Sequence, residues 1–411
     1  MKKFLYFQPE YVSRFKCDGS KCNARCCKAW NIYIETAAYK KYSRIQPKEK
    51  AEEILSHFKF DSKEDLYVVD LKQNVDGDFV CPFLTEKNLC SLRLEYGENF
   101  LSATCATYPR QTHSFGKFFE RSLILTCPVA AEMVLFADEQ LKFEFVEVPD
   151  KIHSMHGKIH MQKFPTNANA GDFIREVQIT MITILQEQWF SLDQRLIVLG
   201  SFTDKLQNLF LNEAGIEEML KLIGEYRSEE FLFTKMPTLL QNFSFDAEQF
   251  VSFMIEFINP CMKILDTAEG RKFLVAFTEV LGFKPDENDL VSLDEITANF
   301  ERLTDARENF SEKYSTFLEN YLVNELFSGV YPWRFREYSL TKNFAVLLIS
   351  YKIFELMMFA ATESGLDSKE DLLAMVDWFM TKTNHNPKLY EKFFELLEYE
   401  NDTRTLMETL L

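Results

Sequence analysis

From Phe173 onward, apolar residues recur every three or four positions, which is the spacing of one face of an α-helix. The segments "FIREVQITMITILQEQWF", "LDQRLIVLGSFTDKLQNLFL", "AEQFVSFMIEFI" and "KEDLLAMVDWFMTKT" all show it. Asp193, Asp246 and Ser368 stand where helix N-caps are expected. The pattern predicts a helical domain over residues 173–411.

The first 135 residues follow a different pattern, in which short apolar pieces alternate with turn-rich stretches. "WNIYIE", "LYVVDL", "FVCPFL" and "SLILTC" are the apolar pieces, and "NVDGD" and "TEKN" lie among the turns. This indicates small strands and helices. Residues 136–172 hold "KFEFVEV" and then several breakers, which predicts a linker or long loop. The expected fold is therefore mainly α, with a small α+β domain over residues 1–135.

Length and hydropathy support a soluble protein of two or three domains. The chain has 411 residues, of which 46% are hydrophobic. The apolar start of the chain is too short for a signal peptide, and the most apolar stretch, "NFAVLLISYKIFELMMFAA", is interrupted by Lys352 and Glu355. We therefore expect a cytoplasmic protein with no membrane partner.

Charge is divided unevenly along the chain. Residues 1–127 carry 20 Lys+Arg against 16 Asp+Glu, whereas the whole chain has a net charge of −17. The rest of the chain is thus strongly acidic, which argues against binding nucleic acid and would favour a cationic partner if the acidic residues cluster on one face. A solvated acidic surface is the simpler explanation of the charge alone.

Cysteine is concentrated near the N-terminus, where eight of the nine cysteines lie within residues 17–127. Cytosolic thiols stay reduced, so such a concentration favours metal binding over disulfides. Cys261 stands alone among apolar residues and is expected to be a core thiol. The candidate metal ligands are Cys17, Cys22, Cys26, Cys27, Cys81, Cys90, Cys105 and Cys127.

Eight thiols suffice for two tetrahedral zinc sites, or for one four-ligand iron–sulfur cluster with four thiols left over. The side chains of the adjacent pair Cys26 and Cys27 are expected to point apart, so at most one of them would join a given cluster. We expect Cys22 or Cys17, one of that pair, and further ligands from the second half of the group.

Spacing argues against two familiar cysteine motifs. The CxxxCxxC run of radical S-adenosylmethionine enzymes is matched by Cys22 and Cys26, but its third position is Ala29. The paired CxxC knuckles of a zinc ribbon are also missing, because no two cysteines are separated by two residues.

Four segments, "QPEYVSRFKCDGSKCNARCCKAWNIYIE", "CPFL", "LSATCATYPR" and "ERSLILTCPVAAEMVL", resemble the flagellin lysine-N-methylase (FliB) family. This family belongs to a broader group with a CxxCxxCC-like cysteine cluster. The likeness continues in "LDQRLIVLGSF" and "NYLVNELFSGVYPW". It implies methyl transfer from S-adenosylmethionine to flagellin lysines by an enzyme with an iron–sulfur cluster, for which 4Fe-4S is favoured over zinc.

No GxGxxG or GxG occurs, so a Rossmann-type methyl-donor pocket is not expected. A lysine must lose its proton before it can attack a sulfonium methyl group, and tyrosines could align the amine while aromatic rings hold the sulfonium. By position, the candidate catalytic residues are Tyr108, Arg110 and Tyr331, and the candidate cofactor-binding residues are Trp30, Arg110 and Trp333. Core or surface roles are the simpler explanation for each.

Two further interpretations remain open. The chain could be a non-enzymatic metal-binding interaction module, or a redox protein whose cluster cycles between oxidation states. His153, His156 and His160 could bind a metal, but the breakers around them favour a loop.

Overall fold

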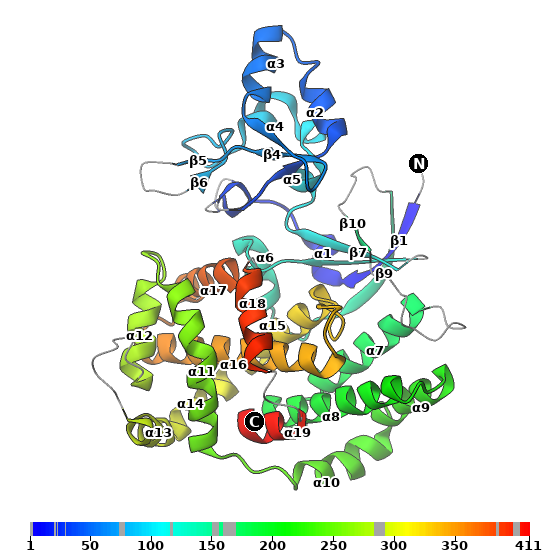
Figure 1. Cartoon of the computed structure of the whole chain (residues 1–411), viewed down its shortest axis with the longest axis vertical. Coiled ribbons are helices and arrows are strands. Elements are labelled where there is room, and N and C mark those ends of the chain that lie inside the picture. Colours follow the sequence, from blue (N-terminus) through cyan, green and yellow to red (C-terminus); the bar gives the residue numbers. More distant parts are fainter. Residues whose placement is uncertain are drawn as a thin grey trace. The chain divides into compact units, whose positions relative to one another are not determined.

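The computed structural model describes residues 3–19, 22, 24–28, 30–73, 79–115, 118–149, 156–158, 170–282, 292–383, 386–397 and 403–411. The chain divides into two compact units (Figure 1). The N-terminal unit comprises Met1–Met133 and Lys142–His160, and the helical unit comprises Val134–Leu141 and Met161–Leu411.

A five-stranded mixed sheet forms one part of the N-terminal unit, in the order β10-β7-β8-β1-β9. Its strands are β1 (Lys3–Pro9), β7 (Arg110–Ser114), β8 (Phe119–Leu123), β9 (Phe143–Pro149) and β10 (His156–Lys158). β1 lies between β8 and β9, parallel to β8 and antiparallel to β9, and its Tyr6 is opposite both Phe119 and Val146. The "KFEFVEV" segment of the predicted connection is thus a strand of this sheet. His156 lies in β10, whereas His153 and His160 fall outside the described residues.

The other part of the N-terminal unit carries most of the cysteines and is built from short elements (Figure 1). A three-stranded antiparallel sheet has the order β2-β4-β3, and β5 pairs with β6. These strands are β2 (Tyr33–Ile34), β3 (Phe58–Asp61), β4 (Leu66–Val69), β5 (Lys72–Gln73) and β6 (Phe79–Val80). The helices are α2 (Thr36–Tyr42), α3 (Lys48–Leu55), α4 (Ser91–Tyr96) and α5 (Ala103–Thr107).

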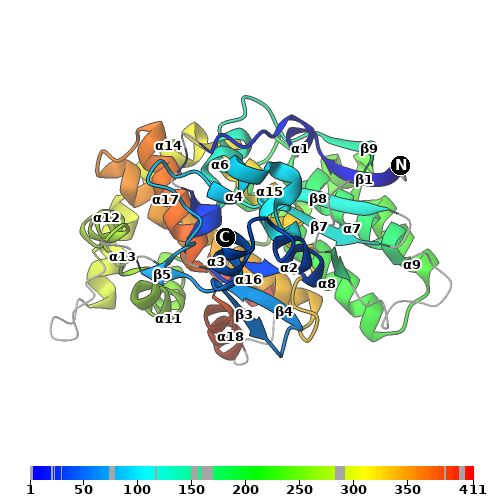
Figure 2. The same ribbon diagram turned by 90° about the horizontal axis from the view of Figure 1, so that it is seen from above.

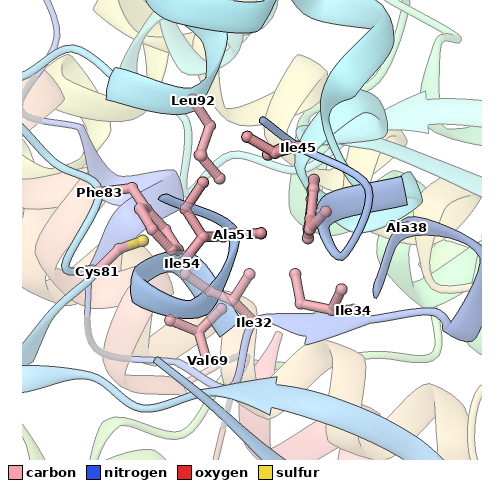
Figure 3. Packing of buried hydrophobic residues seen from close by; sticks show 11 residues of the cluster. Ile32, Ile34, Ala38, Ile45, Ala51, Ile54, Val69, Cys81, Phe83 and Leu92 are labelled. Atoms are coloured by element: carbon pink, nitrogen blue, oxygen red, sulfur yellow. The ribbon is translucent and has the colours of Figure 1, made fainter. Parts of the chain in front are cut away.

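A compact apolar cluster holds these short elements together (Figure 3). Ile32 and Ile34 from the β2 segment pack with Ile54 of α3 and Leu92 of α4, and Cys81 belongs to the same cluster. Burying each aliphatic side chain of this kind contributes about 1.5–3 kcal/mol. One of the candidate metal ligands, Cys81, is therefore part of the core.

The helical unit is organised around α16 (Leu340–Glu363), which contacts α8, α12 and α19 (Figure 1, Figure 2). In the part of the chain that the structure describes, α16 alone is long and apolar enough to cross a membrane, and 89% of its apolar window is buried inside the protein. The main helices of this unit are α7 (Ala170–Leu185), α8 (Leu192–Leu211), α9 (Ile216–Tyr226), α11 (Ala247–Leu265), α12 (Arg271–Leu281), α13 (Leu293–Arg302), α14 (Thr304–Lys313), α15 (Ser315–Ser328), α17 (Lys369–Thr383), α18 (Pro387–Leu396) and α19 (Thr403–Leu410).

Two of the three predicted N-caps are confirmed. Asp246 accepts from the backbone N–H of Gln249 at the start of α11, and Ser368 accepts from that of Asp371 at the start of α17. The prediction for Asp193 is wrong, because Ser191 caps α8 in a capping box with Gln194. Asp193 lies inside the first turn, where its carboxylate is free to bind another partner.

The predicted fold class is confirmed. Most of the described residues are helical. None of the sheets formed by the described residues is a doubly wound parallel sheet. Cys261 is also buried as expected, on the inner face of α11.

Candidate functional site

Three chain segments of the N-terminal unit bring five cysteines together. Cys26 and Cys27 occupy a 3₁₀ turn, Arg25–Cys27, which follows Ala24 in a left-handed backbone conformation. Cys81 comes directly after β6, and its N–H donates to the Cys27 carbonyl over 2.8 Å. Cys90 precedes α4 and Cys105 lies in α5. We call Cys26, Cys27, Cys81, Cys90 and Cys105 the five-thiol group.

The sulfurs of the adjacent pair lie side by side, with Cys26 Sγ 3.7 Å from Cys27 Sγ. The expectation that these side chains point apart is therefore wrong. In a strand, neighbouring side chains are about 180° apart, but a 3₁₀ turn separates them by only about 120°. Cys27 is hydrogen-bonded to the sulfurs of both Cys26 and Cys81.

Hydrogen bonding and burial set the pKa values of the five-thiol group. The hydrogen bonds to Cys26 and Cys81 raise the pKa of Cys27, and they lower the pKa of Cys26 and of Cys81. Burial raises the pKa of Cys90, and it raises the pKa of Cys105 to about 12. A bound cation would reverse the effect of burial, because it stabilises the thiolates.

The other three candidate ligands are Cys17, Cys22 and Cys127, which we call the three-thiol group. Burial raises the pKa of Cys127 to about 12, and charges on Cys22 and Cys17 add to that shift. Cys127 is buried directly before α6 (Pro128–Leu135), whereas Cys17 is exposed. Cys22 also interacts with Cys26, so the two groups adjoin each other.

The five-thiol group has the donor chemistry of a thiolate-ligated metal centre. The 3.7 Å between the sulfurs of Cys26 and Cys27 matches the edge of about 3.8 Å expected for a tetrahedron with metal–sulfur bonds of about 2.3 Å. Within the described ranges, no three His, Cys, Asp or Glu side chains already form a set that could hold a metal ion. Metal binding would therefore require side chains of the group to turn towards a common centre.

Three of the predicted site residues surround the cysteines. Trp30 Nε1 donates to the Cys26 carbonyl over 3.2 Å, and the Trp30 ring lies 5.9 Å from that of Tyr108. The Tyr108 hydroxyl is 3.1 Å from Thr126 Oγ1. Arg110 Nη2 donates to the Phe15 carbonyl over 3.2 Å. Burial lowers the pKa of Arg110, while charges on Cys17 and Cys127 oppose that shift, which places Arg110 beside the three-thiol group.

Tyr331 and Trp333 belong to the helical unit instead. Tyr331 is buried, and the Arg334 guanidinium lies 5.6 Å from its ring. The Trp333 ring is 6.3 Å from that of Phe173. Neither unit by itself contains all five predicted aromatic and arginine residues.

The sequence did not predict a large cavity in the helical unit, with a volume of about 1150 Å³. Helices α8, α13, α14, α15 and α16 contribute most of its lining. The charged side chains that line it are Asp193, Arg195, Glu301, Arg307, Glu308, Glu312, Glu319, Lys352 and Glu355. Six of these are carboxylates and three are cations.

Lys352 connects two of these carboxylates. Its Nζ is 2.7 Å from Asp193 Oδ1 and 2.9 Å from Glu355 Oε2, while Tyr351 donates to Glu355 Oε1 over 2.8 Å. Burial raises the pKa of Glu355, and the charge of Lys352 opposes this. In the sequence, Lys352 and Glu355 are the charged residues that interrupt the most apolar stretch, and they could have indicated a polar site at this place.

The lining also contains a second ion pair, and an arginine that makes no ion pair with a described residue. Arg195 Nη1 is 2.6 Å from Glu319 Oε2, and Glu319 Oε1 is buried without a hydrogen-bond partner. The Arg307 guanidinium lies 3.6 Å from the centroid of the Phe300 ring. Its Nε is likewise buried without a hydrogen-bond partner.

Comparisons with known proteins point to one family. Residues 178–411 match the model of the FliB lysine N-methylase C-terminal domain. The chain is 31% identical over 136 residues to the lysine-N-methylase of Salmonella typhimurium, and this match covers 33% of each chain. It is 29% identical over 143 residues to the flagellar biosynthetic protein FliU of Salmonella muenchen, covering 33% of this chain and 79% of FliU. The matches thus span about a third of the lysine-N-methylase. No solved structure matches.

Proposed function

The chain belongs to the FliB lysine N-methylase family, and from that premise we propose that it transfers methyl groups from S-adenosylmethionine to lysine side chains of flagellin. The observation that carries this proposal is the family match over residues 178–411, which covers more than half of the chain. The names of two relatives, lysine-N-methylase and flagellar biosynthetic protein, support the reaction and the flagellar substrate.

The proposed reaction is a polar displacement. The lone pair of the lysine nitrogen attacks the methyl carbon of the sulfonium, so that a carbon–nitrogen bond forms as the carbon–sulfur bond breaks. The bonding electron pair stays on sulfur, which becomes a neutral thioether, and the lysine proton passes to a base. Because a lysine with a pKa of about 10.4 is protonated at neutral pH, the enzyme must remove this proton or desolvate the amine.

We assign an iron–sulfur cluster, with 4Fe-4S favoured over zinc, to four ligands from the five-thiol group. Its close sulfurs and its place in the core support this assignment. When bound, the cluster would fix short elements that have only a small apolar core between them. A structural role fits the chemistry, because displacement at a sulfonium methyl group requires no electron transfer.

We place the reaction in the cytoplasm, with flagellin as the protein partner and with no nucleic acid or membrane partner. The acidic balance of the chain supports the absence of a nucleic acid partner, because a net charge of −17 repels nucleic acid. If acidic residues meet flagellin, rising salt should slow association through screening. Association that does not depend on salt would contradict this electrostatic contribution.

The direct test is transfer of a labelled methyl group from S-adenosylmethionine to purified flagellin by the purified chain. Label that appears on flagellin lysines after digestion supports the proposal. A folded, cluster-loaded protein that transfers no label would contradict it. Reversible bleaching of its visible absorption on reduction, without methyl transfer, would indicate a redox protein instead.

A further inference from the structure

The cavity of the helical unit has the features of a ligand site rather than of a packing defect. Its volume, about 1150 Å³, slightly exceeds the roughly 300–1000 Å³ of sites for organic ligands, so a ligand of that class has room to fit. The buried Glu319 Oε1 and Arg307 Nε have no hydrogen-bond partner. Unpaired buried polar groups cost about 1–3 kcal/mol each, which a bound ligand could offset.

The cations of the cavity differ in how fully they are neutralised. Arg195 is paired with Glu319, and Lys352 with Asp193 and Glu355. Arg307 contacts the Phe300 ring and donates to Thr304 Oγ1 over 3.3 Å, but makes no ion pair with a described residue. Its Nε has no hydrogen-bond partner, so this edge of the guanidinium is available to donate to a ligand carboxylate.

The carboxylates of the cavity favour a ligand that is also cationic. The lining has six carboxylates against three cations. Three of these carboxylates are exposed, namely those of Glu301, Glu308 and Glu312. Burial lowers the pKa of Arg307, and the charges of Glu355, Asp193 and Glu308 oppose that shift, so a carboxylate held by Arg307 would lie near acidic groups. A free phosphate or a nucleotide would be repelled by this excess of negative charge.

Aromatic rings supply part of the lining. The Phe250 and Phe300 rings stack at 4.9 Å, and those of Phe310 and Phe359 meet edge to face at 5.6 Å. All four line the cavity. These four rings are buried, whereas Trp189 and Phe245 line the same cavity and are exposed. Exposed aromatic faces attract organic cations and stack on flat heterocycles, so Trp189 and Phe245 suit a sulfonium and a purine.

We propose that this cavity is the S-adenosylmethionine site, with the ligand's carboxylate on Arg307 and its ammonium and sulfonium facing the acidic and aromatic lining. The proposal rests on the function proposed above and locates its methyl donor. A carboxylate, two cationic centres and a purine in one molecule match a guanidinium that makes no ion pair with a described residue, the excess of carboxylates and the exposed aromatic rings.

The first test is calorimetric titration of the full chain with S-adenosylmethionine and with its demethylated product. We expect Arg307→Gln to weaken binding of both about tenfold or more, because charge-assisted hydrogen bonds contribute about 1.5–3 kcal/mol. Arg302→Gln is the matched control, because Arg302 is exposed and pairs with Asn299 outside the cavity. It should bind as the unmodified chain does.

A second variant covers the case in which Arg307→Gln fails to fold. Ser311 lines the cavity and is exposed on α14, so Ser311→Trp should obstruct the cavity without disturbing the core. Ser364→Trp, at an exposed position outside the cavity, is its control. We expect loss of binding only in Ser311→Trp.

The outcomes separate this proposal from the proposed function. Binding by both cavity variants at the affinity of the unmodified chain would overturn the cavity assignment and leave the methylase intact. An unmodified chain that binds no S-adenosylmethionine and methylates no flagellin would overturn both. Methyl transfer that survives in Arg307→Gln and Ser311→Trp at the original KM would contradict the cavity assignment alone.

Discussion

Lys352 shows how one charged residue can be retained inside an apolar helix. Only 6% of its side chain is exposed, and two carboxylates compensate its charge.

We predict that Lys352→Met lowers the free energy of unfolding by about 3 kcal/mol, since removing one partner leaves buried charge uncompensated. Urea unfolding measures this. Lys392→Met is the control: Lys392 makes an exposed pair with Glu395, and its loss should cost less than about 1 kcal/mol. Equal effects of the two substitutions would contradict the prediction.

The same network predicts a pH dependence. Burial acts to lower the pKa of Lys352, but the charges of Asp193 and Glu355 raise it above its ordinary value. A lysine with a raised folded pKa contributes stability that is fully present below its unfolded pKa, about 10.4, and is lost at higher pH. The difference in unfolding free energy between the unmodified chain and Lys352→Met should be constant from about pH 7 to 9 and shrink above about 10.4. A difference that already shrinks between pH 7 and 9 would argue against this ion pair.

At the residue scale, the sequence identified the cysteines but not their grouping. Eight local thiols stand out by number, whereas their division into a group of five and a group of three depends on chain folding. Ala24 carries no sequence signal for its left-handed conformation, yet it precedes the turn that brings Cys26 and Cys27 together. Asp193 was predicted as a cap because Asp is common there, and Lys352, 159 positions away, could not be anticipated as its partner.

At the scale of elements, one glycine allows close packing between two helices. Gly270 directly precedes α12, and a Cβ there would come within 1.9 Å of Trp378 Nε1. Trp378 is buried and donates to the Leu265 carbonyl over 3.2 Å. The methyl group of an alanine would therefore displace the indole and break this hydrogen bond.

We predict that Gly270→Ala lowers the free energy of unfolding by about 2–3 kcal/mol, because overpacking a rigid core is destabilising. Gly224→Ala is the matched control, since it lies within α9 and a Cβ there has nothing within 4 Å. It should stabilise the chain by about 0.5–1 kcal/mol through helix propensity. Chemical unfolding monitored by circular dichroism compares the two. A neutral Gly270→Ala would contradict the tight contact.

The predicted elements are correct where a helical period extends over many residues. They are wrong where a strand pairs with a segment far away in the sequence. The helical spacing after Phe173 identified the fold class, because amphipathic helices are defined by local sequence. β9 was included in the predicted connection, since its pairing with β1 joins residues more than 130 positions apart. The local sequence does not reveal which distant segment a strand pairs with.

At the scale of the whole molecule, the five-thiol group should couple metal content to folding of the N-terminal unit. Cys81 is both a candidate ligand and a member of the apolar cluster. We predict that Cys81→Ser loses bound iron and solubility together, because ligand loss removes binding energy that also stabilises the fold. Iron and sulfide analysis of the soluble fraction measures this.

Cys261→Ala is the control for the cysteine variant. Cys261 is buried in α11 of the helical unit, away from the other thiols in sequence, so its loss should leave the iron content unchanged. Chelation of the metal should likewise lower the stability of the N-terminal unit. A soluble, cluster-free Cys81→Ser chain with full methyl transfer would contradict the structural role of the cluster.

The central claim is that this chain methylates flagellin lysines, and the most direct measurement is the intact mass of flagellin made in the same cells with and without it. We predict an increase in whole methyl increments that maps to lysine residues. An unchanged flagellin mass, with the chain soluble and its metal bound, would contradict the claim.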